Sequence, residues 1–84
     1  MRRKRKEVYE ESRIRKLIRF RMFCIYLFVE RYNVFSKNVY EIFEKYGINE
    51  SIDEGYEVLH TVGNEYIIDS LSEEMLRKGW DGKF

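Results

Sequence analysis

The fold of this chain is decided at residues 22–29, where the sequence reads MFCIYLFV. This run is apolar on every face, and Phe, Ile, Tyr and Val would also suit a strand. Apolar residues at spacings of three, four and seven continue on both sides of it, from Ile14 to Phe35, as in an amphipathic helix. We therefore predict a long first helix that begins near Glu10 and ends at Asn33. A helix that is apolar all round is central in its fold or has a second face covered by another chain.

Three more helices are predicted downstream of the first one. Ser36 is a suitable N-cap for a second helix over residues 37–46, and Gly47 fits the left-handed position that follows a helix end. A short third helix begins at the capping residue Asn49 and carries Ile52, Tyr56 and Leu59 inward. The fourth spans residues 64–78 and ends at Gly79.

The composition supports an all-α fold. Proline is absent, and 44% of the 84 residues are hydrophobic, which is too apolar for a disordered chain. We predict a compact bundle of about four helices with a basic N-terminal extension, divided into a flexible arm at residues 1–9 and one helical domain at residues 10–84. Trp80 and Phe84 are expected to pack back onto the body. The predicted core residues are Leu17, Phe28, Phe43, Leu59, Ile67 and Leu71.

Charge is distributed unevenly along the chain. Residues 1–21 contain ten Lys or Arg and three acids, a net charge of +7, whereas residues 22–84 contain six bases and twelve acids, a net charge of −6. Such asymmetry indicates contact with a nucleic acid, a membrane surface or an acidic partner, or a basic arm that folds back on its own acidic body. The acids Glu50, Asp53, Glu54 and Glu57 follow helical spacing and are interpreted as a solvated face or a contact for a basic partner.

The cysteine content and the length of the apolar runs indicate the cellular compartment. Cys24 is the single cysteine, so no intramolecular disulfide is possible, and its apolar neighbours predict a small buried core residue. The longest apolar run has eight residues, whereas a membrane-spanning helix needs roughly 20. We expect a soluble, cytoplasmic protein.

The single histidine lies in the stretch GYEVLHT at residues 55–61. Glu57 and Tyr56 precede His60 by three and four residues, so a helix places them beside it, and Glu65 follows the turn. An imidazole next to a carboxylate can serve acid–base chemistry. We favour a structural reading, in which the ring of His60 bonds the last carbonyls of a short helix while Thr61 caps the next one.

These motifs carry a family resemblance. The sequence YEIFEKYGI at residues 40–48, Ile52, the stretch GYEVLHT at residues 55–61 and the sequence EYIID at residues 65–69 resemble a family of short bacterial proteins of unknown function. The resemblance runs from about Met22 to Lys78 and implies an all-helical fold. Relatives are often encoded beside ADP-ribosyltransferase-like proteins, so it also implies a paired system such as toxin and antitoxin. It implies no catalytic residues, and the basic segment at residues 1–21 departs from its pattern.

The leading functional hypothesis is a non-enzymatic protein-interaction module, such as the antitoxin or regulatory partner of a separately encoded enzyme. The first helix is apolar on more faces than a monomer needs, which predicts a contact with another chain. The candidate partner-binding residues are Tyr56, Glu57, His60, Glu65, Phe20, Phe23 and Leu27.

The alternative hypothesis is a small nucleic-acid-binding regulator that uses the basic N-terminal segment, although no helix-turn-helix or zinc-finger motif accompanies it. Its candidate contacts are Arg2, Arg3, Lys4, Arg5, Lys6, Arg13 and Lys16. With one histidine and one cysteine far apart, the chain predicts no metal site, and no cofactor or small-molecule substrate is expected. An enzyme is the third hypothesis, because no motif supplies a nucleophile, a base and an electrophile together.

Overall fold

The computed structural model describes the backbone of residues 2–84 and the side chains of residues 12–84. This described part contains helices and no strand, which confirms the all-α prediction. There are five helices rather than about four. They are α1 (Arg2–Tyr32), α2 (Ser36–Lys45), α3 (Ile48–Glu54), α4 (Tyr56–Leu59) and α5 (Asn64–Arg77).

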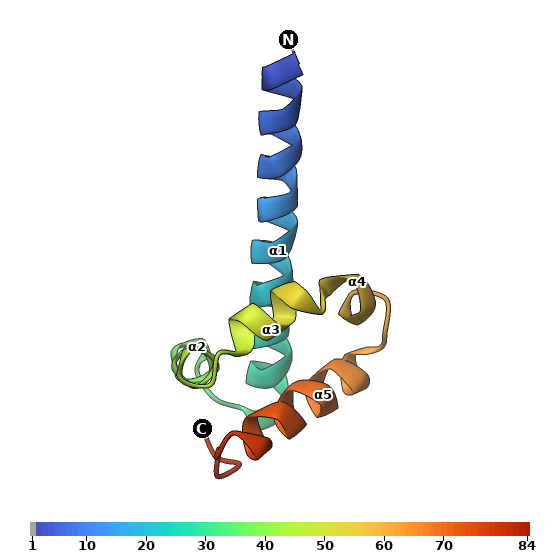
Figure 1. Cartoon of the computed structure of the whole chain (residues 1–84). Coiled ribbons are helices and arrows are strands. Elements are labelled where there is room, and N and C mark those ends of the chain that lie inside the picture. The colour runs from blue at the N-terminus through green and yellow to red at the C-terminus, as the bar shows by residue number, and fades with distance from the viewer. Residues whose placement is uncertain (1) are drawn as a thin grey trace.

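The C-terminal half of α1 is the central element of the fold (Figure 1). Helices α2, α3 and α5 all contact it, and α3 also contacts α2 and α5. Its side chains Cys24, Leu27 and Phe28 are buried, as expected for a helix that lies against several others. The apolar run at residues 22–29 therefore organises the body, as the sequence predicts.

The core agrees with the predicted set at five of its six positions. Phe28, Phe43, Leu59, Ile67 and Leu71 are buried. Leu17 is the exception: it is half-buried and lines a cavity, because it lies on α1 beyond the point where α2 and α5 pack. The remaining buried apolar side chains are Cys24, Leu27, Val39, Ile48, Ile52, Ile68, Met75 and Trp80.

Several predicted helix ends are confirmed. Asn33 follows α1 with a φ of 54°, and Gly47 follows the C-cap of α2 in the left-handed region with a φ of 64°. Gly79, with a φ of 108°, ends α5. Because a Cβ atom makes these values costly, Asn and Gly are the residues that sequence reasoning expects there.

Four predicted junction features were wrong. Phe35, not Ser36, is the N-cap of α2, and no side chain caps that helix. Gly47 is also the N-cap of α3, so Asn49 lies inside the helix and is buried, with no partner for its Oδ1. The third helix is interrupted at Gly55, which separates α3 from α4. Thr61 does not cap α5; its hydroxyl donates back to the carbonyl of Val58 at 2.7 Å.

The C-terminal tail returns to the end of α1, as predicted. Trp80 is buried, and Phe84 packs on the rings of Phe28 and Tyr32 at centroid distances of 5.9 and 5.1 Å. The indole Nε1 of Trp80 donates to the carbonyl of Lys83 at 2.8 Å, which folds the tail on itself. The tail lies at the end of the body that is farthest from the N-terminus (Figure 1).

The N-terminal half of α1 extends away from the body, and the molecule measures 51 × 24 × 22 Å. The backbone is helical from Arg2, and the predicted boundary between an arm at residues 1–9 and a domain at residues 10–84 stays a prediction. Within the described residues, none of the helices has the length and apolar content needed to span a membrane.

Candidate functional site

A mixed aromatic and charged groove forms where α1 crosses α3 and α4. One cavity of about 490 Å³ lies between the N-terminal half of α1 and the end of α3, and a second of about 260 Å³ lies further along α1. Lys16 and Tyr56 line both, so we treat the two as one site, the α1–α4 groove. Its lining residues are Ser12, Arg13, Lys16, Leu17, Arg19, Phe20 and Phe23 from α1, and Asp53, Glu54, Tyr56 and Glu57 from α3 and α4.

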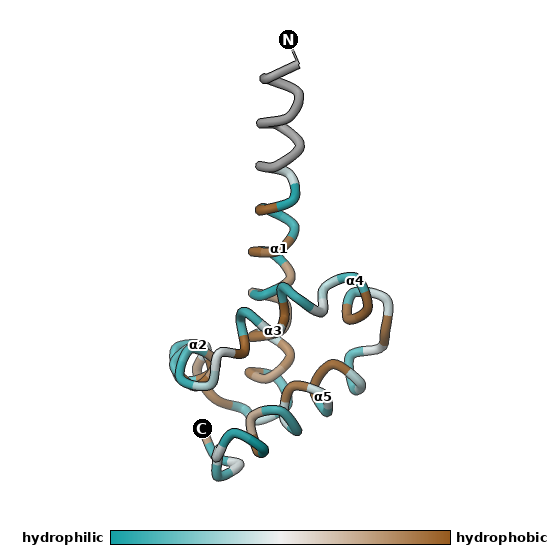
Figure 2. The backbone as a smooth tube through the Cα atoms, in the orientation of Figure 1, coloured by the Kyte–Doolittle hydropathy of each residue, from teal (hydrophilic) through white to brown (hydrophobic). Residues whose placement is uncertain are grey.

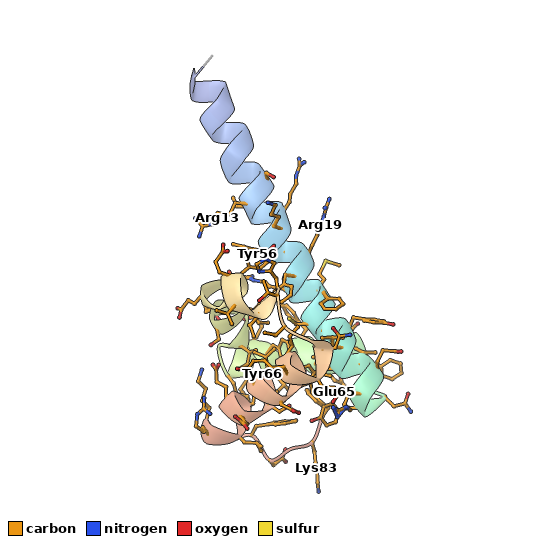
Figure 3. The ribbon with its side chains drawn as sticks, turned by 90° about the vertical axis from the view of Figure 1, so that its right-hand side faces the viewer. Arg13, Arg19, Tyr56, Glu65, Tyr66 and Lys83 are labelled. Carbon is orange, nitrogen blue, oxygen red and sulfur yellow. The ribbon has the colours of Figure 1, made fainter. Side chains whose placement is uncertain are left out.

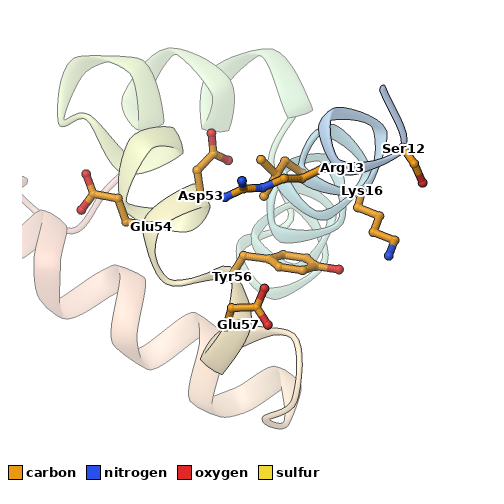
Figure 4. Close-up of a pocket in the computed structure, with 8 residues that line it drawn as sticks. Ser12, Arg13, Lys16, Asp53, Glu54, Tyr56 and Glu57 are labelled. Carbon is orange, nitrogen blue, oxygen red and sulfur yellow. The ribbon is translucent and has the colours of Figure 1, made fainter. Parts of the chain in front are cut away.

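Gly55 places Tyr56 in this groove. The break between α3 and α4 redirects the chain so that the ring of Tyr56 reaches toward α1 (Figure 4). There the ring of Phe20 packs against it in a T-shaped arrangement at 5.3 Å between centroids, and the His60 ring stacks on it at 4.6 Å with a 7° interplanar angle. A ring held by two others presents a rigid, amphipathic contact, because little side-chain entropy remains to be lost on binding.

His60 also contacts the backbone of Tyr56. Its Nδ1 lies 2.7 Å from the carbonyl oxygen of Tyr56, one turn earlier. Tyr56 is the first residue of α4, and its carbonyl also accepts the backbone N–H of His60 at 3.0 Å, so the ring N–H is a second donor to it. The ring therefore has a structural contact within the short helix, but at its first carbonyl and not at the last ones that the sequence predicts. His60 and Glu57 are both exposed, and Glu57 lines the groove beside Tyr56.

Charges of both signs face one another across the groove. The guanidinium of Arg21 binds Asp53 with both ends of its fork, with Nε donating to Oδ1 at 2.8 Å, and this carboxylate raises the pKa of Arg21. Arg13 extends from α1 toward the same carboxylate (Figure 4). The basic helix thus rests partly on the chain's own acids, which is one of the readings left open by the charge pattern.

The structure separates two of the predicted partner residues from this site. Glu65 lies at the start of α5, away from Tyr56, and pairs with Arg31 near the end of α1 (Figure 3). Leu27 is only 6% exposed and belongs to the core, so its side chain is not available to a partner. Phe20 is half-buried under Tyr56, and Phe23 is 39% exposed at the rim of the groove.

The basic candidates fall into two groups. Arg13 and Lys16 are exposed and line the groove, together with Arg19, which is not among the seven candidate contacts. Arg2, Arg3, Lys4, Arg5 and Lys6 lie outside the residues whose side chains the structure describes.

Cys24 is not a site. It is fully buried on the core side of α1, and burial raises the pKa of its thiol to about 12. A thiolate, the reactive form, is therefore strongly disfavoured in the folded chain. Among the described residues, no cluster of three or more His, Cys, Asp or Glu side chains is arranged to hold a metal ion.

Sequence comparison places most of the chain in a known family. The model of a family described as proteins of unknown function (DUF3791) matches residues 19–78, which is more than half of the chain. The chain belongs to this family. Searches of curated proteins and of solved structures gave no match.

The boundaries of the DUF3791 match divide the groove. Phe20, Phe23, Tyr56 and His60 lie inside the matched region, whereas Lys16 and the more N-terminal bases lie outside it. The aromatic part of the site thus lies within the family domain. Two of the three basic residues that line the groove, Arg13 and Lys16, precede it, and the third, Arg19, is the first matched residue.

Proposed function

We propose that this DUF3791 protein is a non-enzymatic protein-interaction module whose partner binds in the α1–α4 groove. One observation carries the proposal: the groove combines an exposed phenylalanine, a rigidly held tyrosine and flanking charges of both signs. Aromatic and arginine side chains around a pocket are the usual composition of protein–protein hot spots.

The proposed partner is a separately encoded enzyme that this chain regulates, as an antitoxin restrains a toxin. The family resemblance supports this, because relatives are often encoded beside ADP-ribosyltransferase-like proteins. The contacts of two side chains that could serve catalysis also support a binding role: Cys24 is buried, and the Nδ1 of His60 bonds a backbone carbonyl. A binding role requires neither a nucleophile nor a general base.

Co-expression with the products of the adjacent genes tests the proposal. We expect one of them to co-purify with the wild-type chain, and Phe23→Ala to weaken that complex by at least about tenfold, the loss typical of a removed aromatic anchor. Leu76→Ala is the matched control, because Leu76 is also exposed but lies on α5 outside the groove. Equal binding by the two variants would show that the groove is not the partner surface.

A second candidate function is nucleic-acid binding. Arg13, Lys16 and Arg19 are exposed on one half of α1, next to Phe23 and Tyr56, on which a base could stack. If this function holds, deleting residues 2–6 should lower the salt dependence of binding by several units, since each phosphate contact contributes about one. Fluorescence anisotropy with single- and double-stranded DNA and RNA measures this, and no detectable binding at low salt would rule it out.

A further inference from the structure

An apolar stripe runs along one side of α1; its first three members are exposed, and its last two are half-buried against the edge of the core. Its members follow the spacing of four, four, three and four residues that keeps side chains on one side of a helix. They are Ile14, Ile18, Met22, Ile25 and Val29. Ile14, Ile18 and Met22 are 55%, 49% and 64% exposed, which is unusual for large apolar side chains in one continuous row.

The exposed part of this stripe, from Ile14 to Met22, faces away from the core by helix geometry. At 100° per residue, Met22 and the fully buried Cys24 point in nearly opposite directions. It is also distinct from the α1–α4 groove, since none of its members lines that site. The apolar excess of α1 that sequence reasoning placed at Phe20, Phe23 and Leu27 is therefore found on a different face.

The two ends of the stripe have different shapes. At its C-terminal end, α1 and α2 enclose an open groove of about 450 Å³ with an almost wholly apolar lining. Its lining residues are Met22, Ile25, Tyr26, Val29, Ser36, Lys37 and Tyr40. At its N-terminal end, Ile14 and Ile18 project from the part of α1 that extends beyond the body, where hydrophobic residues continue past the level of α4 (Figure 2).

We propose that this face binds a second copy of the chain, with the two α1 helices antiparallel and a two-fold axis beside Met22. The projecting end and the groove lie on the same face, on opposite sides of Met22 and at similar distances from it. A two-fold rotation therefore places Ile14 and Ile18 of each copy in the groove of the other. The same patch serves both copies, as a two-fold interface requires.

Charge selects the antiparallel arrangement. Arg15, Arg19 and Glu30 border the stripe on one flank, with the bases at its N-terminal end and the acid at its C-terminal end. The two-fold axis brings Arg15 and Arg19 of one copy alongside Glu30 and Tyr26 of the other, where opposite charges attract and a guanidinium can lie over a ring. A parallel pairing would instead place the two basic halves side by side.

The distribution of charge along the whole chain also favours a second copy as the partner. The basic segment at residues 1–21, with a net charge of +7, would lie along the acidic body of the other copy, with a net charge of −6. Arg19 and Glu30 have no ion-pair partner in the structure of residues 12–84, and both are exposed. About 22 Å of helix separates Ile14 from Val29, which is about four turns of contact on each copy.

A matched pair of tyrosine variants tests the interface. Tyr26 borders the stripe and Tyr66 lies on α5, and the two are 55% and 56% exposed. Size-exclusion chromatography with light scattering should give a dimer for the wild type and for Tyr66→Lys, twice the chain mass of 10.4 kDa. Tyr26→Lys should give the monomer at the same concentration. Partner binding in the α1–α4 groove should survive Tyr26→Lys, so the two proposals fail separately.

Cysteine cross-linking tests the direction of pairing. A mixture of Ile18→Cys and Tyr26→Cys chains should form a disulfide on mild oxidation, whereas Ile18→Cys alone should not, because only the antiparallel arrangement brings residues 18 and 26 together. The buried Cys24 stays unreactive as an internal control. A wild-type chain that is monomeric at high micromolar concentration, an Ile18-to-Ile18 cross-link, or equal effects of the two tyrosine variants would overturn the proposal.

Discussion

The individual contacts of His60 give this residue a structural role. It stacks on Tyr56 and donates from Nδ1 to a backbone carbonyl. His60→Gln keeps a donor, so it should cost about 1 kcal/mol of unfolding free energy, and His60→Ala somewhat more, because the ring stacking is lost as well. Urea unfolding measures both. A His60→Gln chain with wild-type stability that no longer binds its partner would instead mean that the imidazole touches the partner directly.

Cys24 offers a direct readout of core integrity. Because the thiol is fully buried and burial raises its pKa to about 12, alkylation at pH 8.5 requires the core to open. We expect iodoacetamide to modify the folded chain at least about a hundred times more slowly than the chain in denaturant. Mass spectrometry over time gives the two rates. Fast modification of the folded chain would mean that this side of α1 is open to solvent.

Glu74 is the carboxylate with the clearest structural function. Burial raises the pKa of Glu74, but the hydrogen bonds from Lys78 and Ser51 outweigh burial, so the net pKa is lowered. A lowered folded pKa contributes stability above the ordinary carboxyl pKa, and that stability is lost as the pH falls through the folded value.

Glu74→Gln should therefore destabilise the chain by about 1 kcal/mol at pH 7, and this difference should shrink as the pH falls below the ordinary carboxyl pKa and through the lowered folded value. Glu73→Gln is the control, because Glu73 is the exposed neighbour and should have little effect at either pH. Thermal melts across this pH range test the prediction. An unchanged difference at low pH would show that packing, not the charge of Glu74, is responsible.

Among the helix junctions, the one between α2 and α3 depends on a single glycine. Gly47 has a φ of 64° and serves both as the residue after the C-cap of α2 and as the N-cap of α3. Gly47→Ala should cost about 1–2 kcal/mol, because a Cβ atom is disfavoured in the left-handed region. Gly63 is the matched control: its φ is −73° and a Cβ there meets nothing, so Gly63→Ala should be neutral or slightly stabilising. Equal losses would point to side-chain crowding instead.

Local sequence signals predicted most of the helix boundaries. They did not predict that a single residue can end one helix and begin the next. Glycines with positive φ were predictable at positions 47 and 79, since little else tolerates that backbone. The cap expected at Asn49 failed because Gly47 ends one helix and begins the next with no residues between, which leaves Asn49 inside α3. The break at Gly55 was missed because the apolar spacing continues through it.

The candidate site was predictable only in the part that depends on local sequence spacing. Tyr56, Glu57 and His60 are neighbours in one helix turn, so sequence spacing alone groups them. Their contact with Phe20 depends on how α1 crosses α4, which no local pattern encodes. The stripe from Ile14 to Val29 was present in the spacing, but the apolar residues of α1 point in all directions. Only the packed structure shows which of them are covered.

On the scale of the whole molecule, packing is concentrated at one end. The core, the aromatic tail and the interhelical ion pairs all lie around the C-terminal half of α1, whereas its N-terminal half extends beyond the body. Stability should follow this distribution. A domain of this size has a total stability of only about 5–15 kcal/mol, so the loss of one large core side chain removes a large fraction of it.

Trp80→Ala should therefore lower the unfolding free energy strongly, whereas deletion of residues 2–6 should leave it unchanged. Trp80 is 5% exposed and lies against Tyr32 and Phe84, so its truncation should cost about 3–5 kcal/mol and lower the melting temperature sharply. The deletion removes five basic residues from the end of α1 farthest from the body and should leave the unfolding free energy unchanged, as expected if residues 1–9 form an arm separate from the domain. Calorimetry at moderate salt compares the two. If the deletion destabilises the chain as much as Trp80→Ala does, the basic segment belongs to the folded domain, and the proposed boundary near residue 10 is wrong.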